Sequence, residues 1–357
     1  EILDVTDPYN PQRVAATASG GMLRFGLEGN GVDFRRFYLT PIGAALAPLS
    51  IEAADPADLY ATDRQVDLFV VAPRVFAGAL EDYVQYREED GYSISLVSVE
   101  DIMDNFAYGL YDPIAIRDFL KFAYENYPSP APSAVLFVGD GNYDFMDYLS
   151  TGVPNFVPPC LHRLDQSASD DNYVYFGAYG ILDSDTSYAL DGIGFDMITA
   201  RWPVKSISEL SSVVDKIRSY ESSSHFGIWR NNITLVADDE YSGGGVTTET
   251  IHTIQAEELA DHHIPRQFTC DKVYLWDYPF VGNRKPEVNA AIVKAINDGT
   301  LIVNYIGHGN PDVWSHEAVF TRTDDLPRLS NPENLPLVFA ASCAIGFFDD
   351  PEREGMA

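Results

Sequence analysis

The segment LIVNYIGHG, residues 301–309, and the segment LVFAASC, residues 337–343, decide the fold of this chain. Each begins with a mostly apolar run, the pattern of a strand buried in a parallel sheet. Each ends in a reactive side chain, His308 in the first and Cys343 in the second. Because the carboxyl ends of parallel strands open at one edge of a sheet, neighbouring strands would bring this imidazole and this thiol together.

Strands and helices alternate along the rest of the chain from about residue 63. This alternation predicts an α/β fold with two side-by-side subdomains, each a mostly parallel sheet flanked by helices. The predicted strands are 68–71, 93–96, 134–138, 196–201, 233–237 and 272–275, and the predicted helices are 77–88, 113–127, 206–220, 248–262 and 286–297.

The chain divides into three parts on this pattern. Residues 1–62 carry Pro, Gly and short alternating patches, which predict the end of a β-rich N-terminal domain. Residues 63–205 form the first α/β subdomain, to which we assign no catalytic role. Residues 206–357 form the second subdomain, which carries the Cys/His site.

Composition limits the class of partner. The 357 residues include 54 acidic against 23 basic side chains, a net charge of −31, which repels nucleic acid and anionic membranes. The basic residues are 6 Lys and 17 Arg, and a lysine-poor, carboxylate-rich surface suits a saline or extracellular setting. Three cysteines are too few and too scattered for a disulfide framework or a CxxC metal site.

Cys343 and His308 are the candidate nucleophile and base. A thiol with a pKa of ~8.5 needs a neighbouring base to form the thiolate at neutral pH, and an imidazole can later protonate the leaving amine. The amides of Gly309 and Cys343 are candidates for an oxyanion hole. A buried cysteine at a strand end is usually inert, so the pairing with His308 carries this prediction.

The remaining cysteines and histidines have no such context. We interpret Cys160 and Cys270 as structural, and His162, His262, His263 and His316 as surface or packing residues. The spacing of these residues indicates no zinc site. Carboxylates at 170–171 and at 183 and 185 could hold calcium, but they fit no EF-hand, and a solvated acidic loop is the favoured reading. No cofactor is required, and calcium stays a candidate ligand.

The stretch 304–309, followed by Trp314 and by 335–343, resembles the gingipain family of cysteine peptidases. The resemblance extends through 169–173 and 198–201 and covers roughly residues 65–357. It implies a caspase-like fold, with the histidine after one strand and the cysteine after the next. Segments 115–121 and 136–141 resemble the PorU-like branch, a sortase of the type IX secretion system.

The resemblance assigns roles to individual residues. Cys343 becomes the nucleophile and His308 the general base and acid. The family's third member is an acid after the first strand of the second subdomain; Glu240 is the preferred match, with Asp239 and Asp238 as alternatives. Glu249 falls near the acid that selects a basic side chain in gingipain substrates, although an acidic first helical turn explains it equally well. No metal ligand is implied.

The function implied is removal of the C-terminal secretion signal of cargo proteins through a Cys343 thioester, which water or an amine then resolves. Implied partners are secreted proteins with that signal, other type IX secretion components and an amine on anionic lipopolysaccharide. The implied location is extracellular, at the outer membrane of a bacterial cell surface. The alternatives are a plain secreted endopeptidase and a catalytically silent calcium- or partner-binding surface module.

The family's sequence pattern continues beyond residue 357 with a helix and further strands. We therefore expect a second subdomain that is truncated at its C-terminus, and poor peptide turnover by this piece alone.

Overall fold

The computed structural model describes residues 1–7, 10–26, 35–41, 50–51, 53, 55–161, 167–177, 194–222, 226–239 and 250–356. The chain divides into two compact units, Glu1–Asp55 and Pro56–Ala357. The strands of the first unit are all antiparallel, which agrees with its short alternating patches. They form a sheet of order β2-β1-β5 and a β3-β4 hairpin: β1 Ile2–Asp4, β2 Gln12–Arg13, β3 Thr17–Ser19, β4 Met22–Arg24 and β5 Phe37–Leu39.

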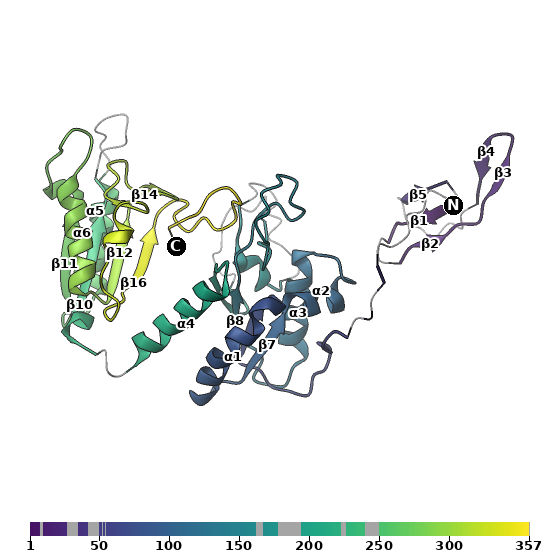
Figure 1. Ribbon diagram of the computed structural model, residues 1–357, viewed down its shortest axis with the longest axis horizontal. Helices are drawn as coiled ribbons and strands as arrows, with labels where there is room; N and C mark the ends of the chain where they lie inside the picture. The colour runs from purple at the N-terminus through teal and green to yellow at the C-terminus, as the bar shows by residue number, and fades with distance from the viewer. Residues whose placement is uncertain are drawn as a thin grey trace. The chain divides into compact units, whose positions relative to one another are not determined.

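The second unit begins with a parallel sheet of order β7-β6-β8-β9. Figure 1 shows helices α1, α2 and α3 beside its strands β7 and β8. Its strands are β6 Leu68–Ala72, β7 Ile94–Ser98, β8 Ala134–Val138 and β9 Ile198–Trp202. The helices of this part are α1 Arg74–Glu89, α2 Val99–Phe106 and α3 Pro113–Asn126, with a 3-10 turn, η1, at Asp170–Tyr173.

Apolar side chains cover both faces of this first sheet, as expected for strands that read as continuous apolar runs. On one face Phe69 and Phe137 pack with α2 and α3 around Phe119, which is fully buried. Burying a side chain of this size stabilises the fold by about 1.5–3 kcal/mol. On the other face Val70 packs with α1 and with α4 Ile207–Glu221. Helix α4 therefore belongs to the core of the first sheet, although its residues lie in the 206–357 segment.

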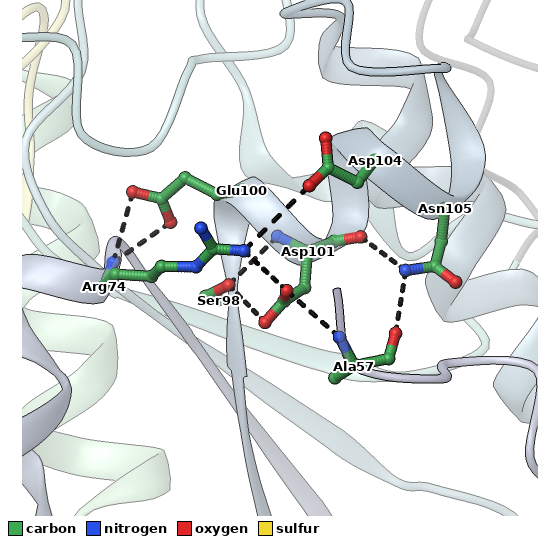
Figure 2. Close-up of polar contacts among 7 residues, drawn as sticks. All are labelled: Ala57, Arg74, Ser98, Glu100, Asp101, Asp104 and Asn105. Atoms are coloured by element: carbon green, nitrogen blue, oxygen red, sulfur yellow. Dashed lines mark hydrogen bonds and ion pairs between the residues drawn. The ribbon is translucent and has the colours of Figure 1, made fainter. Parts of the chain in front are cut away.

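The N-termini of α1 and α2 are joined by a polar network (Figure 2). The Ser98 hydroxyl accepts a hydrogen bond from the Asp101 amide at 2.9 Å and so caps α2. Asp101 in turn forms an ion pair with Arg74 at 2.7 Å and accepts from the Ala57 amide at 3.2 Å. The network holds the N-termini of both helices and Ala57, near the start of this unit, at the carboxyl ends of β6 and β7.

The second sheet is also parallel and has the order β11-β10-β12-β16. Its strands are β10 Asn232–Ala237, β11 Thr269–Tyr274, β12 Ile302–Ile306 and β16 Leu337–Ala341. The helical segments around it are η3 Ile228–Asn231, α5 Ile251–Glu258, the π-helical turn η4 Leu259–His263, η5 Leu275–Asp277, α6 Pro286–Asp298 and η6 Leu326–Arg328. Three two-residue strands form a small antiparallel sheet: β13 Gly309–Asn310, β14 Val313–Trp314 and β15 Phe320–Thr321.

Helices α5 and α6 cover opposite faces of the second sheet. Val236 and Val303 pack with Ile292 and other α6 residues on one face, whereas Leu235 packs with Ala256 of α5 on the other. This alternation follows from the two-residue period of a strand. Two mostly parallel sheets flanked by helices confirm the predicted fold class. Among the described residues, no helix combines the length and apolar character that crossing a bilayer requires.

Candidate functional site

Three neighbouring strands of the second sheet end at one edge. The register pairs Ala237 of β10 with Ile306 of β12, and Ile306 with Ala341 of β16. The next residues along the chain are Asp238 after β10, Gly307-His308 after β12 and Ser342-Cys343 after β16. The structure thus brings the predicted imidazole and thiol to the same sheet edge, from positions that are far apart in the sequence.

His308 and Cys343 line one pocket. Its volume is about 280 Å³, and its lining includes Gly309, Ser315 and His316. The Cys343 side chain is exposed and His308 is half-buried. The Cys343 thiol is therefore accessible to a substrate, whereas an inert structural cysteine at a strand end is usually buried.

The other two thiols lie elsewhere. Cys160 is buried in the core of the first sheet, where burial raises the pKa of its thiol to about 11. Cys270 lies on β11 and is half-buried. Neither thiol lines the pocket that contains Cys343.

The two glycines that flank His308 let the strand ends approach each other. A Cβ added at Gly307 would lie 2.5 Å from the Asp238 Cβ, and one added at Gly309 would lie 2.5 Å from the Ser342 Oγ. Real Cβ atoms do not come this close to other heavy atoms. Glycine is therefore required at position 307, where the nearest atom is the Cβ of Asp238. At position 309 the nearest atom is the end of the Ser342 side chain, which can rotate away.

The backbone of His308 is fixed from both sides. Its amide donates to the Asp238 carboxylate at 2.9 Å, and its carbonyl accepts from the Ser315 amide at 2.7 Å. The Tyr305 hydroxyl donates to the same carbonyl. The imidazole ring of His308 has two aromatic neighbours. Its centroid lies 5.2 Å from the ring centroid of His252 and 5.1 Å from that of His316.

Asp238 is the acid that the described residues place beside His308. It is buried, and one of its carboxylate oxygens lies within 4.8 Å of a ring nitrogen of His308. Burial raises the pKa of Asp238 to about 6, against the opposing effect of hydrogen bonds from the amides of His308 and Asp239. The preferred sequence match, Glu240, lies outside the described residues.

Three buried ionisable side chains, Asp239, Lys285 and Glu317, lie close to Asp238. Lys285 forms an ion pair with Asp239 and donates to the Leu275 carbonyl at 2.6 Å. A carboxylate oxygen of Glu317 lies within 4.8 Å of those of Asp238 and Asp239. Glu317 is fully buried. Burial raises the pKa of Glu317, and the negative charge of Asp239 adds to this effect.

Sequence reasoning missed three of these residues, His252, Lys285 and Glu317. Lys285 directly precedes the proline that starts α6, a position that reads as an exposed loop. Glu317 and His252 stand in no recognisable motif. His316 was interpreted as a surface or packing residue; it is exposed, and it also lines the pocket.

Some expected site residues lie elsewhere or outside the described ranges. Glu249, Asp183 and Asp185 lie outside the described residues, as does His162. Asp170, a candidate calcium ligand, instead accepts two hydrogen bonds of 2.7 Å from the buried Arg201 guanidinium. This ion pair gives Asp170 a structural partner at the end of the first sheet.

Comparison with known proteins relates this geometry to a family. The sequence model of peptidase family C25 matches residues 61–357. Gingipain R2 of Porphyromonas gingivalis is 22% identical over 284 residues, which are 79% of this chain and 32% of that protein. Gingipain R1 of the same species is also 22% identical over 284 residues, or 24% of its length. The chain thus spans about a third or less of the curated relatives it matches.

Solved structures show the same fold. The crystal structure of the Arg-specific cysteine proteinase gingipain R has a TM-score of 0.56 at 20% identity, covering 83% of this chain and 58% of that one. Dimeric latent PorU from Porphyromonas gingivalis has a TM-score of 0.50 at 21% identity, covering 64% of this chain and 22% of that one. Because the family model spans nearly all of the second unit, the chain belongs to peptidase family C25.

Proposed function

We propose that this chain carries the catalytic centre of a cysteine peptidase, with Cys343 as nucleophile and His308 as general base and acid. One observation supports the proposal most directly. The two side chains line one pocket at the ends of the neighbouring strands β12 and β16, and the thiol is exposed.

The reaction needs only groups at this edge. His308 takes the proton of the Cys343 thiol, and the thiolate attacks the scissile carbonyl carbon. The C–N bond then breaks as His308 passes its proton to the leaving amine, and a thioester to Cys343 remains. Gly309 and Cys343 both line the pocket, and their amides are proposed to stabilise the oxyanion.

Asp238 is proposed to position His308. Its carboxylate accepts a hydrogen bond from the His308 amide at 2.9 Å, so it fixes the backbone that carries the imidazole. Glu240 remains the residue that the family resemblance favours for this task. Glu249 is proposed to select a basic side chain in the substrate.

The acyl-enzyme can be resolved by water or by an amine. The likeness to PorU and to the sortase branch supports the finer proposal that the substrates are secreted proteins with a C-terminal signal. The acceptor would then be water or an amine on anionic lipopolysaccharide. This reaction would take place at the bacterial outer-membrane surface, together with other type IX secretion components. A protein of net charge −31 suits such a saline, extracellular location.

Thiol alkylation tests the peptidase proposal. The rate of iodoacetamide modification at Cys343 and Cys270 is measured from about pH 5 to 9 by peptide mass spectrometry. We expect Cys343 to react well below pH ~8.5, because a nearby base forms the thiolate. His308→Ala should remove that advantage, and His263→Ala, which changes an exposed histidine outside the pocket, should not. Equal reactivity of Cys343 and Cys270 at pH 6 contradicts the proposal and favours the silent surface module.

Product analysis separates the sortase from the plain endopeptidase. A peptide with a C-terminal signal is incubated with the protein and an excess of a small primary amine. Mass spectrometry then shows a new amide if the thioester is aminolysed, and only a free carboxylate if water is the acceptor. Cys343→Ser is the control, since neither product should form without the thiolate.

A further inference from the structure

Two histidines and an aspartate converge beside the pocket. One ligand atom each of Asp238, His252 and His308 lies within 4.8 Å of the others. They come from three elements: the end of β10, the first turn of α5 and the end of β12. The convergence is therefore a product of the fold and not of closeness in sequence.

The donor set selects the kind of cation. Two imidazole nitrogens and one carboxylate oxygen are the ligands of three-residue zinc sites, whereas calcium and magnesium prefer oxygen alone. Zinc–ligand bonds of about 2.0–2.2 Å place tetrahedral ligand atoms roughly 3.4 Å apart. Small side-chain rotations bring atoms within 4.8 Å of one another to that separation.

Two further features favour the site. The Asp238 carboxylate is oriented by the amides of His308 and Asp239, at 2.9 and 3.0 Å, and fixed ligands bind metals more tightly. The chain's net charge of −31 also concentrates cations at its surface.

We propose that Asp238, His252 and His308 bind one zinc ion, and that this ion reversibly blocks the catalytic centre. Zinc held by the His308 imidazole removes the base that forms the Cys343 thiolate. A three-ligand site keeps a fourth position for water or a thiolate, and His308 shares its pocket with Cys343. The blocking effect rests on the proposed function, whereas zinc binding itself does not.

Metal competition tests the site directly. Zinc is titrated into the intact chain against the chromophoric chelator 4-(2-pyridylazo)resorcinol, which reports stoichiometry and affinity. We expect one tightly bound zinc per chain, and at least tenfold weaker binding in His252→Ala and in Asp238→Asn. His262→Ala is the matched control, because His262 is exposed in the η4 turn outside this cluster. Melting temperatures show that each variant is folded. Equal affinity in His252→Ala, His262→Ala and the unchanged chain overturns the proposal.

Alkylation of Cys343 provides a second readout. Zinc should slow iodoacetamide modification of Cys343 at least tenfold at pH 7 in the unchanged chain, and much less in His252→Ala. Calcium at the same concentration should have no such effect. Cys270 serves as the internal reference. An equal zinc effect in both proteins means that the ion acts elsewhere and overturns the site.

The outcomes separate this inference from the proposed function. Zinc bound through His252 in a protein that cleaves no peptide supports the site and contradicts the peptidase. If the protein cleaves peptide but His252→Ala leaves its zinc affinity unchanged, the result supports the peptidase and contradicts the zinc site.

Discussion

Gly307 tests whether the strand ends must approach as closely as the structure places them. In Gly307→Ala the new Cβ would meet the Asp238 Cβ at 2.5 Å and the Tyr305 hydroxyl oxygen at 2.6 Å. Overpacking of this kind costs about 1–3 kcal/mol. We expect a lower melting temperature together with a loss of the enhanced alkylation rate at Cys343, because His308 follows directly.

The matched control is Gly78→Ala in α1. A Cβ there meets nothing within 4 Å, so this change should stabilise the helix by about 0.5–1 kcal/mol and leave Cys343 reactivity unchanged. If Gly307→Ala behaves like Gly78→Ala, the close approach is not required.

Asp238 makes stability depend on pH. Its pKa is about 6 in the folded chain and 3.8 ordinarily, so the folded state retains a proton that the unfolded state has released. The stability associated with this proton is therefore present below about pH 4 and is lost as the pH rises through 6. A shift of this size corresponds to at most about 3 kcal/mol at 1.36 kcal/mol per unit.

Urea unfolding of the unchanged chain and of Asp238→Asn measures this effect at pH 4, 5, 6 and 7. Asparagine does not titrate, so the free-energy difference between the two proteins should change by up to about 3 kcal/mol across that range and be constant above pH 7. A difference that stays the same at every pH contradicts a raised pKa at Asp238.

Only some residues of this edge can be found from the sequence. His308 and Cys343 each come two residues after the end of an apolar strand, so the chain order alone places them at strand ends. His252, Lys285 and Glu317 reach the same region from a helix, a helix N-terminus and a short connection. Their closeness depends on how these elements pack, which no local pattern records.

One buried ion pair joins the loop after β10 to the start of α6. Lys285 and Asp239 are both almost fully buried. Removing one partner of such a pair costs about 3–5 kcal/mol, because the other charge stays in a medium that solvates it poorly. We expect this loss of unfolding free energy in Lys285→Met, measured with urea at pH 7.

The control is Lys294→Met. Lys294 pairs with Asp298 on the exposed side of α6, where solvent screens the pair, so its loss should change the free energy of unfolding little. Adding Asp239→Asn to Lys285→Met should recover part of the loss. If Lys285→Met and Lys294→Met lower the free energy of unfolding equally, burial of the Lys285–Asp239 pair adds no stability.

The elements themselves were predictable where the apolar period is clear. Strands β6, β8, β10, β12 and β16 lie within a residue or two of the predicted runs. Helix α2 was missed because it follows β7 without a break, although Ser98 and the acidic Glu100 and Asp101 mark its start. The two-residue strands β13–β15 carry too little sequence to show any period.

The chain's net charge of −31 opposes the compact folded state. Salt shortens the screening length from about 10 Å at 0.1 M to about 3 Å at 1 M. We expect the melting temperature to rise between 0.1 and 1 M sodium chloride. Glucose at matched osmolality is the control, since it screens no charge. A melting temperature that falls or stays level with salt contradicts dominant self-repulsion.

The sheet order β11-β10-β12-β16 makes the closeness of His308 and Cys343 depend on the pairing of two neighbouring strands. His308 follows β12 and Cys343 follows β16, and among the described residues these two strands pair in parallel, from Ile302 with Leu337 to Ile306 with Ala341. Parts of a folded protein can open locally at a lower free energy than the whole chain needs to unfold. An opening confined to the β12–β16 pairing would separate the Cys343 thiol from the His308 imidazole while most of the core is intact, so the reactivity of this thiol would change before the fold is lost.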